Sequence, residues 1–284
     1  MAHELEVIGP ASSWLSERVQ TFCESLAGTA WGDVPPARLV IAQDLAVALR
    51  RYLPADRYQA WERRQRDRGN QATGVGTGFV ASDGVPTAVV VALPESTNRA
   101  DLLSLCCHEL GELSIEATGG EDRETMDAAM SGLIWSEHVV ERRRAEVFTP
   151  QRWPRSVMDR SFLSRLWKDY QADFPGLIQW AVRNDAVPDQ MYGHWQIITR
   201  EAVCAYGRAQ GGNLDEEREI EAFLGLQPDD LTRAWLDLMI VCDRAFASPQ
   251  LDRDELDAIG QEGWHRVYEA LRSRWNQAYF AAQL

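Results

Sequence analysis

The stretch that decides the fold runs from residue 87 to residue 112 and reads TAVVVALPESTNRADLLSLCCHELGE. Its first part is rich in β-branched residues and ends at Pro94, which predicts a strand over residues 86–93. One of the polar residues at 96–98 can then cap a helix that continues to the Gly119-Gly120 pair. A strand followed directly by a long helix predicts a region of mixed α and β structure.

The residues before this stretch predict further elements. Asp83-Gly84 lies between two β-prone runs and is a strong hairpin signal, so strands are expected over residues 77–82 and 86–93. The segments 12–28 and 37–53 both read as amphipathic helices. The N-terminal part of the chain is therefore expected to combine a few helices with a small set of strands.

The residues after this stretch are expected to be helical throughout. A second helix is predicted from about residue 121 to residue 147, and the segment TPQRWPRS at 149–156 is the best candidate for a domain boundary. The predicted fold class is therefore α+β and predominantly helical. We expect an α+β domain over residues 1–148, with its core at 75–148, followed by an all-helical domain over residues 155–284.

Composition excludes several classes of partner and location. The net charge is −14, and nucleic-acid binding needs a basic footprint, so no nucleic-acid partner is expected. The longest apolar run, TAVVVAL, is too short to span a membrane. The five cysteines are odd in number and show no CxxC spacing, and the N-terminus lacks the features of a signal peptide. These observations predict a cytoplasmic protein without membrane association.

The helix in the deciding stretch carries a compact set of polar residues. His108 and Glu112 are four residues apart and therefore neighbours on one helix face, and Glu109 is offset by one position. Two ligands at this spacing can hold a zinc ion, and a glutamate between them can serve as the general base on a metal-bound water. The spacing therefore permits a metal site in which His108 and Glu112 are ligands and Glu109 is the base.

The following helix offers more candidate ligands. Glu137 and Glu141 are also four residues apart, and His138 lies between them as an additional candidate ligand. The same helix face continues backwards through three apolar residues, which are Leu133, Met130 and Met126. This stripe is expected to pack against the preceding helix, which would bring His108 and Glu112 together with at least one of the three candidates.

At this point the chain resembles a known family. A strand, a short polar connection, a helix bearing HELGE and a second helix bearing a glutamate resemble the core of the zincin metallopeptidases, and most closely their gluzincin branch and the intracellular ImmA/IrrE type. The resemblance covers residues 75–148 and implies a metal-dependent hydrolase of peptide or amide bonds. It implies His108 as a ligand, Glu109 as the base, and Glu137 or Glu141 as the third ligand. Glu112 stands where the family has its second histidine, so the motif is HExxE in place of HExxH.

Three alternatives remain open for these residues. His108 can be a structural histidine bonded to Glu112, and Glu137 and Glu141 can pair with the arginines at 142–144. In that case the protein is a degenerate zincin-like interaction or regulatory protein. A site with one histidine and two carboxylates can also favour a harder divalent metal than zinc, and adding His138 to His108 gives a set that suits non-haem iron.

The expected partner follows from the resemblance. We expect a peptide or protein as the partner. It would be the substrate if the protein is a hydrolase, and a regulatory partner if it is an interaction protein.

Overall fold

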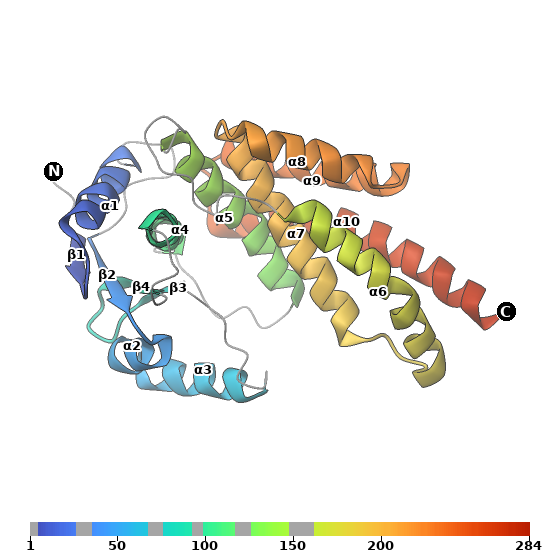
Figure 1. The fold of residues 1–284 in the computed structure, drawn as a ribbon, viewed down its shortest axis with the longest axis horizontal. Coiled ribbons are helices and arrows are strands. Elements are labelled where there is room, and N and C mark those ends of the chain that lie inside the picture. The colour runs from blue at the N-terminus through green and yellow to red at the C-terminus, as the bar shows by residue number, and fades with distance from the viewer. Residues whose placement is uncertain (1–4, 27–35, 68–75, 93–98, 117–125, 148–161) are drawn as a thin grey trace. The chain divides into compact units, whose positions relative to one another are not determined.

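The structure of the protein is a computed structural model, and it describes residues 5–26, 36–67, 76–92, 99–116, 126–147 and 162–284. The chain divides into two compact units, which are described separately. Unit 1 comprises residues 1–121 and 150–159, and unit 2 comprises residues 122–149 and 160–284. The fold is α+β and predominantly helical, as the sequence predicts (Figure 1).

Unit 1 contains all the described strands. Its elements, in chain order, are β1 (Leu5–Ile8), α1 (Ser13–Leu26), β2 (Ala37–Ala42), α2 (Leu45–Tyr52), α3 (Ala55–Asp67), β3 (Gly76–Val80), β4 (Pro86–Val91) and α4 (Arg99–Glu116). The strands form one sheet in the order β1-β2-β4-β3. β1, β2 and β4 are parallel, and β3 pairs antiparallel with β4 in the hairpin that Asp83-Gly84 predicts.

The sheet of unit 1 is covered on both faces. α4 packs against β3 and β4 and also contacts α1, while α2 and α3 lie across the opposite face (Figure 1). Val40 and Val89 pack with α2, whereas Leu39 and Val90, whose side chains alternate with theirs, are buried as well. Continuous apolar strands of this kind are typical of parallel sheets that are enclosed by helices.

One predicted helix is wrong. The segment 37–53 contains a strand, β2, followed by the short helix α2. The side chain of Asp44 accepts a hydrogen bond from the Val47 amide and so caps α2, which fixes the point where the helix begins. The apolar run over residues 39–42 suits a buried strand and a helix equally well by its hydropathy alone, and here the sheet determines the outcome. The sequence reading also missed the four-residue strand β1.

Unit 2 is helical throughout its described residues. Its elements are α5 (Met126–Val147), α6 (Leu163–Asn184), α7 (Asp189–Gln210), α8 (Leu214–Gly225), α9 (Asp229–Phe246) and α10 (Arg253–Gln283). α5 packs mainly against α7 and α10, and α9 packs against α10. Several tryptophans stand in the core of this unit: Trp167, Trp195, Trp235, Trp264 and Trp275.

The place of α5 differs from the expected one. The sequence predicts this helix as part of a domain over residues 1–148, but its packing places it in unit 2. Its apolar stripe was expected to pack against α4. Instead, Met130 belongs to the core of unit 2 and Leu133 packs against that core. The long helices of unit 2 offer α5 a large apolar surface, and burial of that surface stabilises this arrangement. The side chain of Met126 lies outside the described residues.

Candidate metal centre

α4 presents its polar side chains beside the sheet of unit 1. Leu103, Cys106 and Leu110 are fully buried and fix the rotation of the helix. His108 and Glu112 are then left half-buried, and Glu109 is 6% exposed. The packing of α4 therefore sets the position of the three residues that the sequence analysis singled out.

The structure brings these three residues together. One ligand atom from each of His108, Glu109 and Glu112 can be chosen so that all lie within 4.8 Å of one another. The Nε2 atom of His108 lies 3.4 Å from Oε1 of Glu112. Ligands about 2.1 Å from a tetrahedral metal are separated by about 3.4 Å, which is about 1.63 times that bond length. A typical N–H···O hydrogen bond is shorter, at about 2.9–3.0 Å. The observed separation is compatible with a metal-ligand pair and also with an ion pair between neighbours one helical turn apart.

Glu109 lies against the strand at the edge of the sheet. A Cβ atom placed on Gly76 of β3 would overlap the Glu109 carboxylate and would lie 2.8 Å from its Cγ atom. The side chain of Glu109 therefore lies directly over the backbone of β3. A glycine at position 76 leaves the space that this carboxylate occupies, and the sequence analysis did not single out that glycine.

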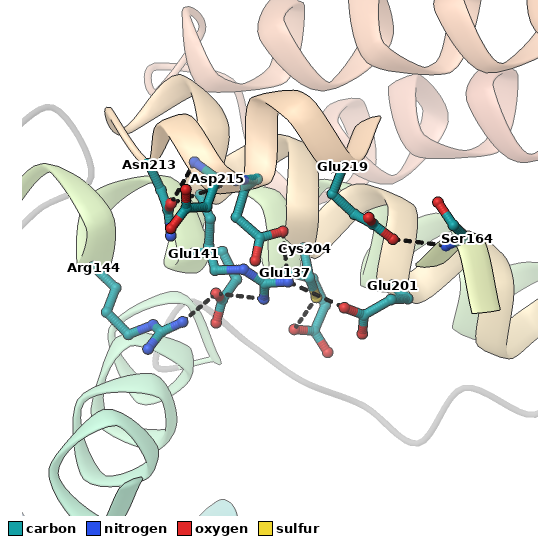
Figure 2. A network of polar contacts seen from close by, with 11 residues as sticks. Glu137, Glu141, Arg144, Ser164, Glu201, Cys204, Asn213, Asp215 and Glu219 are labelled. Atoms are coloured by element: carbon teal, nitrogen blue, oxygen red, sulfur yellow. Dashed lines mark hydrogen bonds and ion pairs between the residues drawn. The ribbon is translucent and has the colours of Figure 1, made fainter. Parts of the chain in front are cut away.

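Glu137 and Glu141 are buried in unit 2, and both have arginine partners there. Figure 2 shows Glu141 beside Arg144 and Glu137 beside Cys204. Oε1 of Glu137 lies 2.7 Å from Nη2 of Arg200, and the Cys204 thiol donates a hydrogen bond of 3.4 Å to Oε2 of Glu137. Glu141 pairs with Arg144 on its own helix and, at 3.0 Å, with Arg208 of α7. The predicted burial of both carboxylates is confirmed, and these partners offset its electrostatic cost.

Arg208 is the centre of this network. Its guanidinium also lies 3.1 Å from Glu201 and 3.4 Å from Glu216. Burial alone would lower the pKa of Arg208, but the charges of the surrounding carboxylates outweigh it and raise that pKa above its usual value. Burial, and after it the Glu137 charge, raises the pKa of the Cys204 thiol, which therefore stays protonated. One permanently charged arginine thus holds three carboxylates from three helices.

His138 occupies the core of unit 2. Its ring stacks on Tyr206 at a centroid distance of 5.3 Å and meets Phe246 edge-on, and its Nε2 atom lies 4.0 Å from Oδ1 of Asp243. Burial, with a further contribution from the Arg142 charge, lowers the pKa of His138 to about 3. The imidazole is therefore neutral at physiological pH.

The predicted site residues thus fall in two places. His108, Glu109 and Glu112 lie together in unit 1, while Glu137, His138 and Glu141 belong to unit 2. The turn expected to join the two helices, at residues 118–122, lies outside the described residues. The convergence of both sets on one ion stays a prediction.

Comparisons with known proteins did not identify a family for this chain. A scan of family models, a search of curated proteins and a search of solved structures each found no significant match. The resemblance to zincins stays a prediction from the sequence.

Proposed function

We propose that α4 holds a divalent metal ion through His108 and Glu112 and that the protein is a metal-dependent hydrolase of peptide or amide bonds. The separation of 3.4 Å between His108 Nε2 and Glu112 Oε1 carries this proposal. Zinc is the leading candidate for the metal. A harder divalent metal is the alternative, because carboxylates contribute a larger share of the ligands than in a two-histidine site.

Each of the three residues on α4 would have a distinct role in hydrolysis. His108 and Glu112 would hold the ion, which would lower the pKa of a water molecule. Glu109 would accept the proton of that water and pass it to the leaving amine. Its place over the edge strand supports this role, since a peptide lying along β3 would bring a carbonyl group close to the carboxylate.

A third ligand from Glu137 or Glu141 remains part of the proposal. The arginine partners of both carboxylates favour a structural role for the pair in unit 2. A metal ion would have to compete with these cations for the same oxygens.

Hydrolysis is tested directly with a mixture of synthetic peptides. The full chain is incubated with the mixture after loading with zinc, manganese or cobalt, and the products are identified by mass spectrometry. We expect cleavage that stops when a chelator is added and resumes when the metal is restored. Metal-loaded protein that cleaves no peptide would contradict the hydrolase proposal while leaving the metal site itself open.

Substitution of Gly76 tests the place of the base. Gly76→Ala should lower metal-dependent hydrolysis roughly 10²-fold, because the new methyl group displaces the Glu109 carboxylate by about an ångström. Zinc affinity should change little. Gly78→Ala is the matched control, since a Cβ at position 78 meets Leu113 at 3.0 Å and not the carboxylate. Equal rates for the two variants would argue against Glu109 as the base.

A catalytically degenerate interaction or regulatory protein is the second candidate. The glutamate at position 112 and the arginine partners of Glu137 and Glu141 favour it. The Glu112→His variant distinguishes an active hydrolase from a degenerate interaction protein. If the wild-type site is intact, the variant should change a metal affinity that is already present; if the site has lapsed, the variant should gain zinc binding that the wild type lacks. Iron enrichment after anaerobic purification would support the third reading, in which His108 and His138 share one ion.

The proposal also includes the cellular location of the protein and the class of its partner. None of the helices described in either unit combines the length and the hydropathy that a membrane span requires. All five cysteines are described, buried and without disulfides. This supports a reducing, cytoplasmic environment. We propose a peptide or protein as the substrate or partner.

A further inference from the structure

A hollow between α6 and α7 in unit 2 lies outside the candidate metal centre. Its volume is about 510 Å³, and it is lined by Asp173, Gly176, Leu177, Trp180, Pro188, Asp189 and Gln190. The four residues from α6 follow the spacing i, i+3, i+4 and i+7 and therefore share one face of that helix. The volume falls within the roughly 300–1,000 Å³ that is typical of binding pockets.

The chemistry of this hollow is that of a site for a cation with an apolar stem. Asp173 and Asp189 supply two carboxylates, and no cationic residue is among the described residues that line the hollow. Trp180 is 45% exposed. Transfer of an indole ring from water to an apolar environment has a favourable free energy. Leu177 and Pro188, which also line the hollow, are buried and apolar. Carboxylates, a partly exposed indole and buried apolar residues together match the three parts of an arginine side chain.

We propose that this hollow binds an arginine side chain presented by a segment of another protein. A planar guanidinium stacks on an indole and pairs with carboxylates, and arginine forms such contacts more often than lysine does. The chain carries a net charge of −14, which draws basic partners towards it. Asp173 already has a neighbour, since its Oδ2 atom lies 3.4 Å from Nε2 of His194, so Asp189 is the better residue for a test.

The structure offers a matched pair of variants for this test. Asp189 is the first residue of α7 and follows Pro188, which is the N-cap. Asp229 stands at the same place in α9, directly after the N-cap Pro228, and is exposed like Asp189. Asp189→Asn and Asp229→Asn therefore remove the same charge from the same helical position, and only the first change falls in the hollow.

Gly176 provides a second, independent variant. A Cβ atom at this position meets nothing within 4 Å, and Gly176 lines the hollow, so Gly176→Leu adds a side chain at the lining. Leucine also has a better helix propensity than glycine, and the variant should be at least as stable as the wild type. Loss of binding in this variant therefore reports on the hollow and not on unfolding.

The experiment uses the full chain with ¹⁵N-labelled tryptophan indoles and the probe peptide acetyl-Ala-Leu-Arg-Leu-Ala-amide. The Trp180 signal is assigned by its absence from Trp180→Phe. We expect that signal to shift saturably, with binding at least fivefold weaker for Asp189→Asn and for Gly176→Leu and unchanged for Asp229→Asn. The same peptide with citrulline, the neutral isostere of arginine, should bind at least fivefold more weakly.

Three results would overturn the proposal. The first is equal binding of the arginine and citrulline peptides, which would indicate an apolar site. The second is equal binding by Asp189→Asn and Asp229→Asn. The third is a Trp180 signal that shifts with protein concentration in the absence of peptide, which would indicate that a second copy of this chain fills the hollow.

Discussion

Replacing Arg208 with methionine should lower the free energy of unfolding by about 3–5 kcal/mol. The reason is the placement of this residue in the buried network of unit 2. Arg208 lies within 3.4 Å of carboxylates from Glu141, Glu201 and Glu216, and it is itself 5% exposed. Methionine fills much of the same space but leaves the buried carboxylates of Glu141 and Glu216 without this cation, and a buried charge that loses its partner is strongly destabilising.

Urea unfolding followed by circular dichroism measures this effect. Arg218→Met is the matched control, because Arg218 forms a single ion pair of 3.8 Å with Asp215 and its side chain is 78% exposed. That variant should differ from the wild type by less than about 1 kcal/mol. A similar loss for both variants would mean that the network around Arg208 contributes little beyond an ordinary surface pair.

Replacing Glu109 with glutamine should lower hydrolysis about 10²–10⁴-fold, which is the usual contribution of a general base. Glutamine keeps the shape of the side chain and its place over Gly76, but it cannot accept the proton of the attacking water. Metal binding should persist, since the proposed ligands His108 and Glu112 are unchanged.

Rates are measured with a peptide that the wild-type protein cleaves, and the bound metal is counted in the same samples. Glu217→Gln is the control, because Glu217 is an exposed residue of α8. If Glu109→Gln keeps the wild-type rate at full metal occupancy, another group must serve as the base.

Most of the fold could be predicted from local sequence signals. The hairpin at Asp83-Gly84, the helix that carries His108 and the helices of unit 2 follow from turn chemistry, caps and apolar periodicity. The prediction of a helix over residues 37–53 is wrong because a short apolar run, here residues 39–42, has the same hydropathy in a buried strand and in a buried helix. Only its pairing with β1 and β4, which are distant in sequence, makes it a strand.

The candidate site could be predicted only in part. The cluster of His108, Glu109 and Glu112 is local, since all three stand within two turns of one helix. The partners of Glu137 and Glu141 are not local, because Arg200 and Arg208 follow more than 60 residues later in the chain.

Zinc titration of the tag-free full chain, with His108→Ala as the comparison, tests the central claim most directly. We expect calorimetry to show one zinc ion bound per wild-type chain. The affinity should fall by at least about a hundredfold in His108→Ala, since loss of even an outer-shell partner typically costs 10–100-fold. A wild-type protein that binds no zinc, manganese or cobalt, or a His108→Ala variant that binds zinc as tightly as the wild type, would contradict the metal site on α4.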